Sequence, residues 1–341
     1  MKARQRAIGP RTCQGFSLIE LMVALTLGFF VVIACIAAYL GAAQASRVSQ
    51  AQGRMNEDGQ AALVILAQQL RMAGNNPDRS GRVDNTDPSL SSRRNPVYGP
   101  TTFATGTYVP SLFSVRGCNG LFTNIGTATN LDGLNCPGGV SVLPDSLAVS
   151  YEADGFNTTP TAITDGAVPT DCLGNKLATI TAAVPTVLGA GVVLTNVTYT
   201  MADNRFYIAT DGTLNTPGLY CKGNGLASTA QSMVDDVEDM KFTYGALSMA
   251  TTAASAPAAT VAGYLRADEL NALSVSTNDP APWGQVLSVR ICVLVRSESN
   301  LLSDTVSARY LKCDGTLEMN PPDQRMRQAY FSTVVLRNRR L

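Results

Sequence analysis

Residues able to do chemistry are few in this chain, and their types exclude several catalytic centres. The chain has 341 residues and no histidine. Neither a Ser-His-Asp nor a Cys-His nucleophile pair can therefore form, and no metal can be held by imidazole. Lys plus Arg and Asp plus Glu number 26 each, which leaves no net charge and no general basic surface for nucleic acid. The sequence shows no specific nucleic-acid site.

Carboxylates gather at one place, in the segment that contains Asp235, Asp236, Glu238 and Asp239. Paired carboxylates can transfer protons or bind Ca²⁺. The EF-hand spacing is absent, and a solvated turn ahead of a strand explains the cluster more simply. We expect no catalytic residue, no metal site and no cofactor.

Another acid, Glu20, stands at the start of a long apolar run. From Leu21 to Ser46 no side chain is charged, and this run exceeds the ~20 residues with which a helix crosses a bilayer. A carboxylate within a membrane helix costs roughly 2.5 kcal/mol or more, so by default it marks a function. The residues ahead of it include four bases and no acid: Lys2, Arg4, Arg6 and Arg11. That asymmetry favours a cytoplasmic N-terminus and an exported remainder.

An ordinary secretory signal is one interpretation of this N-terminus. Ala43-Gln44-Ala45 supplies an A-x-A tripeptide of the kind that signal peptidase cuts. The apolar run, however, is about twice as long as the usual apolar region of ~7–15 residues. The helical pattern also continues past the tripeptide, which argues against removal of the helix.

The segment Gln14-Gly15-Phe16-Ser17-Leu18-Ile19-Glu20 resembles the N-terminal signal of type IV pilins and type II pseudopilins. That signal is a basic leader, a glycine before the scissile bond, and then Phe-Thr/Ser-Leu-Ile/Leu-Glu. The resemblance implies that prepilin peptidase cuts between Gly15 and Phe16 and methylates the Phe16 amine. It also implies an assembly and recognition role for Glu20, whose carboxylate would pair with a Phe16 amine in the filament core.

A helix must position these residues, and its pattern continues well beyond the apolar run. Apolar residues recur at helical spacing at Val48, Ala51, Met55, Ala62, Leu66 and Leu70. No proline interrupts 16–76, and Gly74-Asn75-Asn76-Pro77 then supplies stop residues. The sequence thus predicts a helix over about 16–73, roughly 85–90 Å long.

Beyond Pro77 the sequence predicts strands separated by turn signals and long loops. Residues 75–145 and 246–260 read as loops. We expect an α+β, pilin-like fold in which the long helix packs on an antiparallel sheet. The expected parts are a leader (1–15), a transmembrane or filament-core half-helix (16–45), an amphipathic half (46–76) and an exported β-rich domain (77–341). The expected strands are Ser146–Tyr151, Gly191–Tyr199, Arg205–Ala209, Gly218–Cys221, Asp239–Tyr244, Val286–Val295 and Phe331–Leu336.

Five segments resemble the minor pilin family called PilW. Three contain a predicted strand each: Gln231–Gly245 (QSMVDDVEDMKFTYG), Val286–Ser297 (VLSVRICVLVRS) and Tyr330–Arg339 (YFSTVVLRNR). The others are Leu70–Gly74 (LRMAG), which closes the helix, and Asp145–Tyr151 (DSLAVSY). The resemblance covers both ends and about a third of the chain.

Eight cysteines divide between the parts of the chain. Cys13 belongs to the leader, and Cys35 lies in the apolar helix, where a lone thiol is usually a small apolar filler. Six others lie in the exported domain, and an even number there indicates disulfides. Six cysteines allow fifteen connectivities. We favour pairing of sequence neighbours, which closes plausible loops: Cys118–Cys136, Cys172–Cys221 and Cys292–Cys313.

The resemblance implies a structural assembly protein and no enzyme, namely a minor pilin in the priming or tip complex of a type IV pilus. Its implied partners are prepilin peptidase, other minor pilins and the major pilin through N-terminal helices, and an adhesin at the tip. The implied location is the inner membrane, with one span and a periplasmic C-terminal domain, and afterwards the pilus on the cell surface. Two alternatives stay open. One is a minor pseudopilin of type II secretion; the other is a membrane-anchored periplasmic enzyme or binding module.

Overall fold

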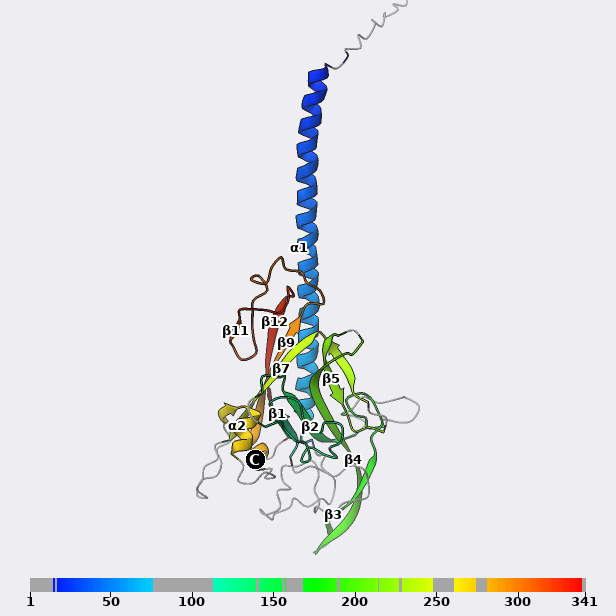
Figure 1. The fold of residues 1–341 in the computed structure, drawn as a ribbon. Coiled ribbons are helices and arrows are strands. Elements are labelled where there is room, and N and C mark those ends of the chain that lie inside the picture. The colour runs from blue at the N-terminus through cyan, green and yellow to red at the C-terminus, as the bar shows by residue number, and fades with distance from the viewer. Residues whose placement is uncertain are drawn as a thin grey trace, which may run out of the picture. The chain divides into compact units, whose positions relative to one another are not determined.

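The computed structural model describes residues 15, 17–75, 113–138, 141–154, 157, 168–188, 191–213, 215–226, 229–247, 261–273 and 281–338. Two compact units, 1–51 and 52–341, are distinguished in the chain, and helix α1 (Leu18–Met72) contributes residues to both. The fold is α+β and pilin-like, with a long N-terminal helix followed by antiparallel sheets (Figure 1). The expected fold class is confirmed.

Helix α1 begins at Leu18 because Ser17 caps it. The Glu20 backbone N–H donates to Ser17 Oγ at 3.2 Å. This is the N-cap to N3 bond of the S-x-x-E capping pattern, and it satisfies one of the backbone donors that a helix start leaves free. The helix therefore starts two residues later than the sequence pattern predicts.

The C-terminal part of α1 buries one stripe of side chains. Met55, Ala62, Leu66 and Leu70 are all buried, as the helical spacing predicts, whereas Val48 and Ala51 remain partly exposed. Three further buried positions complete the stripe: Gly59, Leu63 and Ala67. Within the second unit, this face therefore forms part of the main hydrophobic core.

The end of α1 is held by a residue from the far end of the chain. Gly74 has φ 73°, a left-handed conformation that glycine adopts without strain at a helix end. The Asn338 side-chain amide donates to the Arg71 carbonyl at 2.8 Å. It thereby satisfies one of the carbonyl groups that a helix C-terminus leaves unpaired.

The larger sheet has the strand order β1-β2-β4-β5-β6, with β3 paired to β4. All of its pairs are antiparallel. Strand β2 is buried along its whole length and carries the predicted strand Ser146–Tyr151. The strands are β1 (Val115–Cys118), β2 (Ser146–Ala153), β3 (Thr179–Leu188), β4 (Gly191–Thr210), β5 (Pro217–Lys222) and β6 (Gln231–Asp235).

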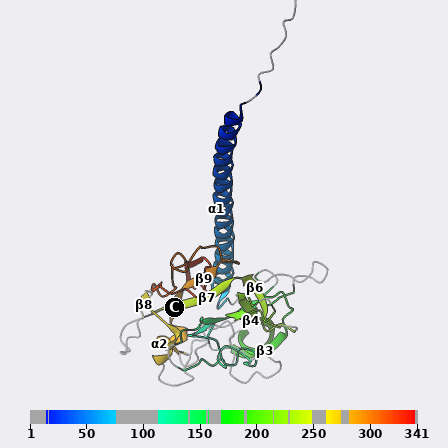
Figure 2. The same cartoon turned by 45° about the horizontal axis from the view of Figure 1, so that its top comes forward.

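The second sheet has four antiparallel strands in the order β12-β9-β7-β8. Figure 2 labels three of its strands, β7, β8 and β9. A short hairpin, β10 (Tyr310–Leu311) with β11 (Leu317–Glu318), forms a third sheet. The remaining elements are β7 (Val237–Leu247), β8 (Val261–Leu265), α2 (Ala267–Ala272), α3 (Ala281–Gly284), β9 (Val286–Arg296) and β12 (Arg327–Val335).

Strand β4 is one strand where the sequence predicts two, Gly191–Tyr199 and Arg205–Ala209. The polar residues between the predicted strands continue the strand because they are buried and paired. Arg205 forms a two-bond ion pair with Asp203, at 3.0 and 2.8 Å. It also donates to two carbonyl oxygens of the segment after β1. Because these carbonyl groups lie far away in the sequence, the local sequence pattern at the polar run indicates a break between two strands.

Several strands were not anticipated. Strand β1 lies within the 75–145 stretch that was expected to be loop, and β3 follows a turn-rich region. Strand β3 contains Pro185, which has no N–H to donate to a neighbouring strand. Among the described strands β3 pairs only with β4, so it is an edge strand. Proline is tolerated in edge strands. The loop expected at 246–260 falls outside the described residues from 248 onward.

Three disulfides join six cysteines of the second unit. The bonds are Cys118–Cys136, Cys172–Cys221 and Cys292–Cys313, with Cα separations of 5.5, 6.6 and 5.6 Å. These are the same pairs that neighbour pairing predicts. Cys35 is free and exposed, while Cys13 falls outside the described residues.

Candidate processing and assembly site

Gly15 and Ser17 are the described residues nearest to the expected cleavage point, and both lie outside helix α1. Gly15 is exposed and non-helical, and a Cβ added there would meet nothing within 4 Å. Phe16 falls outside the described residues. The cap at Ser17 begins the helix at Leu18, so the described backbone at position 15 stays outside the helix. A peptidase that binds an extended chain requires such a segment.

Glu20 lies in the first turn of α1 and is exposed. An anion at this place is favoured by the helix dipole, whose positive end is at the N-terminus. Among the described residues its carboxylate has no ion-pair partner. The pairing expected with the Phe16 amine involves a residue outside the described part and stays a prediction.

The N-terminal half of α1 presents apolar side chains outward in every direction. Leu18, Phe30 and Tyr39 are 78%, 70% and 73% exposed. This helix, alone among those described, is long and apolar enough to cross a membrane, and none of its most apolar 18-residue window is buried. A core helix of a globular protein would instead be covered by its own chain. This half therefore requires cover from outside the chain, either lipid or other helices.

The second half of α1 docks closely on β12. The ring of Tyr330 lies over Gly59, so that an added Cβ would come within 2.5 Å of its Cδ2 atom. The Tyr330 hydroxyl donates to Asn56 Oδ1 at 2.7 Å. Sequence reasoning did not single out Gly59, although a glycine in the middle of a helix's buried stripe is the signal that could have identified it. The contact fixes the helix on the sheet.

Two of the four acids in the segment 235–239 form ion pairs, and for these the expectation of a solvated turn was wrong, whereas Asp235 is exposed and accepts a hydrogen bond from the Ser232 hydroxyl. Asp236 lies between β6 and β7 and pairs with Arg296 at 3.0 Å. Glu238 is bonded through both oxygens to the side chain of Arg327. Within the part of the chain that the structure describes, no group of three or more His, Cys, Asp or Glu side chains could hold a metal ion.

Arg327 holds the segment that follows β9 onto the sheet. Its side chain is fully buried and bonds Glu238 on one side and Asp323, at 2.6 Å, on the other. The guanidinium also lies 5.2 Å from the centre of the Tyr310 ring. A buried charge is tolerated only when it is paired in this way. The acids thus have a structural role.

Asp145 connects the entry of β2 to β7. Its Oδ2 accepts the Phe242 N–H at 2.9 Å, and its Oδ1 lies 3.3 Å from Lys241 Nζ. Burial raises the pKa of this carboxyl to about 6, against the lowering effect of Lys241. Two segments that were recognised separately in the sequence, DSLAVSY and DMKFTYG, therefore meet at one buried carboxylate.

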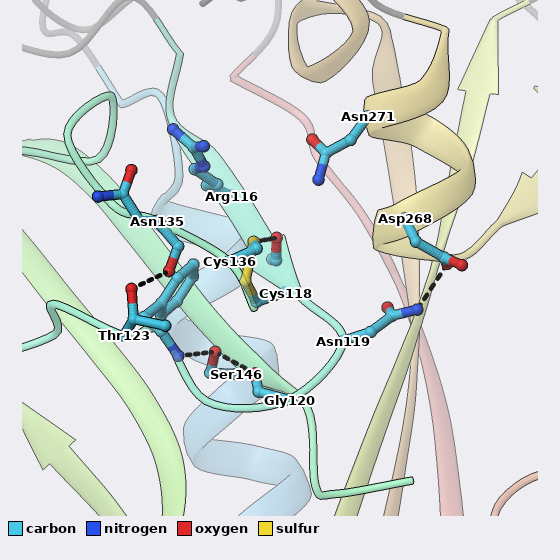
Figure 3. The surroundings of a disulfide bond; sticks show 12 residues. Arg116, Cys118, Asn119, Gly120, Thr123, Asn135, Cys136, Ser146, Asp268 and Asn271 are labelled. Atoms are coloured by element: carbon cyan, nitrogen blue, oxygen red, sulfur yellow. Dashed lines mark hydrogen bonds between the residues drawn. A yellow bond between two sulfur atoms is a disulfide. The ribbon is translucent and has the colours of Figure 1, made fainter. Parts of the chain in front are cut away.

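The disulfide Cys118–Cys136 anchors the irregular segment between β1 and β2 (Figure 3). Ser146 Oγ donates to the Gly120 carbonyl at 2.8 Å and accepts the Phe122 N–H at 3.2 Å. In the same view the Asn119 amide reaches Asp268 at the start of α2. The disulfide and these bonds give a segment without regular structure a fixed place.

Two family models match the chain. Residues 205–338 match the type IV pilus-assembly protein W model, and residues 10–36 match the prokaryotic N-terminal methylation motif. Comparison with curated proteins and with solved structures found no match. The first match includes β12, which carries the buried Arg327 and also Tyr330, whose hydroxyl is bonded to Asn56 of α1. The second contains Gly15, Phe16 and Glu20. The chain is accordingly similar to the type IV pilus-assembly protein W family over 205–338, and it carries the prokaryotic N-terminal methylation motif of type IV pilin-like proteins over 10–36.

Proposed function

We propose that the chain is a minor pilin, a subunit of the priming or tip complex of a type IV pilus. Prepilin peptidase cuts between Gly15 and Phe16 and methylates the new amine. The chain then passes from the inner membrane, where its C-terminal domain is periplasmic, into the pilus. Its role is structural and not enzymatic.

The observation that carries this proposal is the fully exposed apolar half of α1 directly behind the methylation motif. Cleavage after Gly15 leaves the complete helix on the mature chain, whereas signal peptidase cutting after Ala45 would remove its apolar half. An uncovered helix of this length is suited first to a bilayer and then to a bundle of similar helices. Prepilin processing keeps this helix on the mature chain, so the helix can lie first in the bilayer and then in the bundle.

Glu20 gives the assembly step its specificity in this proposal. A carboxylate at the start of an otherwise uncharged half-helix (21–46) is strongly disfavoured in a dry bundle unless an amine faces it. The methylated amine of Phe16, on the same or a neighbouring subunit, supplies that charge. The partners are therefore other minor pilins and the major pilin, with a tip adhesin bound through the globular domain.

Mass spectrometry of the N-terminus of the mature protein tests the processing step. The expected species begins with N-methylated Phe16. Gly15→Val should block processing, because a β-branched side chain would replace the bare backbone next to the scissile bond. Ala45→Gln is the matched control, since it disables only the alternative signal-peptidase tripeptide. A mature N-terminus at Met1 or Ser46 would refute the proposal.

The pseudopilin alternative is tested in the cell. Deletion of this chain should lower the number of pili on the surface and leave type II secretion of exoproteins unchanged. Re-expression of the wild-type chain should restore the pili. Loss of secretion with normal piliation would assign the chain to the secretion system instead. The match to a pilus-assembly family supports the first outcome.

A further inference from the structure

Helix α1 begins three residues after Gly15, and Ser17 accepts hydrogen bonds from its start. The Glu20 N–H donates to Ser17 Oγ and the Leu21 N–H donates to the Ser17 carbonyl, each at 3.2 Å. Ser17 is thus the N-cap, a position whose backbone is extended and not yet helical. The described residues on the two sides of the expected scissile bond, Gly15 and Ser17, therefore both precede the first helical turn.

The sequence at this place contains two patterns that are typical of a helix start. Ser17 and Glu20 form the S-x-x-E pattern of the capping box. Phe16 and Leu21 occupy the two positions, one before the cap and four after it, that carry the apolar pair of a hydrophobic staple. All four residues lie within the match to the methylation motif over 10–36. The motif that marks the chain for processing therefore also specifies where its helix begins.

A helix that loses its N-cap can shift its start in two directions. An inward shift would unwind Leu18 and Ile19 and leave their backbone groups unpaired in hydrocarbon, which is strongly disfavoured. An outward shift would pair the same N–H groups with the carbonyls of Gln14 and Gly15. Glycine opposes such growth only weakly, because its helix propensity is poor but not prohibitive. In a membrane we therefore expect the uncapped helix to grow toward the leader.

Helix growth in that direction would interfere with cleavage. Proteases cut backbone that is free of helical hydrogen bonds and open it locally where it is not. A helix over 15–17 would enclose the bond between Gly15 and Phe16, so it would have to open before each cut. The cap prevents this because it ends the helix two residues beyond Gly15.

We propose that Ser17 is a positioning residue for prepilin cleavage. By capping α1 it keeps the backbone between Gly15 and Phe16 extended, and the peptidase depends on this conformation and not on a contact with the hydroxyl group. The inference rests on the proposed processing at this bond. It gives the second residue of the mature chain a role in presenting the substrate, which is distinct from the assembly role of Glu20.

Cleavage of the full-length precursor by membranes that contain prepilin peptidase tests the proposal. The measurement is kcat/KM for release of the leader, followed by mass spectrometry. Ser17→Asn and Ser17→Gly keep good capping residues and should stay within about twofold of wild type. Ser17→Ala and Ser17→Leu should be cut about fivefold more slowly, which corresponds to the ~1 kcal/mol that a cap usually contributes. Glycine has neither hydroxyl nor methyl group, so direct recognition of the side chain predicts instead that Ser17→Gly is cut no faster than Ser17→Ala.

Amide hydrogen exchange of the same precursors in detergent reports the helix start independently of cleavage. The N–H groups of Leu18 and Ile19 should exchange more slowly in Ser17→Ala than in wild type or Ser17→Asn, because the longer helix pairs them. Thr26→Ala is the matched control. Its hydroxyl donates to the Val23 carbonyl within the same helix at 2.9 Å, and its loss should change neither the cleavage rate nor the exchange at the helix start.

Three results would overturn the proposal. Ser17→Asn cut as slowly as Ser17→Ala would mean that the peptidase contacts the hydroxyl group. Ser17→Ala cut as fast as wild type would remove Ser17 from the cleavage step, and slower cleavage with unchanged exchange would remove the helix start as its cause. In each case wild type is still cut after Gly15, so the proposed function stands. A wild-type chain that is not cut there refutes both.

Discussion

Replacement of Gly59 by alanine probes the docking of α1 on the sheet. A Cβ at this position would lie 2.5, 2.6 and 2.7 Å from three ring carbons of Tyr330. Tyr330 is 7% exposed and its hydroxyl is bonded to Asn56, so the ring has little room to move. Overpacking of this kind costs about 1–3 kcal/mol. Alanine recovers about 1 kcal/mol of helix propensity, and the net effect should be a loss of about 0–2 kcal/mol.

Gly53→Ala is the matched control. It lies on the same helix, but a Cβ there would meet nothing within 4 Å, so only the propensity gain of up to about 1 kcal/mol applies. The two variants should therefore differ by about 1–3 kcal/mol in unfolding free energy. The measurement is urea unfolding of the disulfide-intact chain in detergent, followed by fluorescence of Trp283, which is the only tryptophan and is 3% exposed.

A double-mutant cycle between Gly59 and Tyr330 tests the same contact directly. Tyr330→Ala removes the ring, so Gly59→Ala should then cost nothing and should stabilise the helix as Gly53→Ala does. The coupling between the two sites should be at least about 1 kcal/mol, as for residues in direct contact. If Gly59→Ala proves as stable as Gly53→Ala in the wild-type background, the close approach of helix and ring is refuted.

Three further predictions follow from the assembly segment and the buried charges. Glu20→Ala should leave the unfolding free energy of the globular domain unchanged but lower the amount of this chain in sheared pili at least tenfold, as measured by immunoblotting; normal incorporation would remove Glu20 from the assembly step. Because burial raises the pKa of Asp145 to about 6, its folded form is stabilised when protonated, and stability is lost as pH rises from about 4 to 6. Wild type should lose about 3 kcal/mol relative to Asp145→Asn over that window, and parallel pH profiles from urea titrations would contradict this. Arg327→Met should cost about 3 kcal/mol in the same titrations, because Glu238 and Asp323 lose a fully buried partner; a cost below about 1 kcal/mol would mean that both acids are adequately solvated.

The sequence predicts the long helix and most of the central strands because each has a strong local pattern. The stripe from Met55 to Leu70 follows helical spacing, and the stop at Gly74 follows from its conformational freedom. The start of the helix was placed two residues early because apolar periodicity does not show a cap. Ser17 and Glu20 carry the capping pattern that would have corrected it.

Polar residues with distant partners were harder to place. The segment before Arg205, with Asp203, looked like a break in β4 because the ion pair of Asp203 and Arg205 is completed by carbonyl groups of a loop about eighty residues earlier. Asp236 and Glu238 looked like a solvated turn because Arg296 and Arg327 lie far along the chain. The disulfide pairs, in contrast, all join neighbouring cysteines, and two of the three bridge sequence separations of only 18 and 21 residues.

Of the candidate site, the motif residues could be named from the sequence, but not the surface that surrounds the helix end. Gly15 and Glu20 stand in a local pattern that needs no fold to be recognised. That surface depends on Asn338, whose side chain donates to the Arg71 carbonyl at the end of α1. No local sequence pattern indicates this contact. The side chains of that surface become neighbours only through the antiparallel arrangement of the strands.

The contact between Asn338 and the end of α1 has a consequence for how the exported chain matures. The bond joins residues separated by 267 positions, and Tyr330 meets Asn56 across 274. Contacts of such long range form late, because the loop between them must close first. Until β12 is in place, Gly59 lacks the Tyr330 ring that covers it, and the last carbonyl groups of α1 lack the Asn338 cap. Chains interrupted before β12 should therefore be cut by proteases more readily than the complete chain.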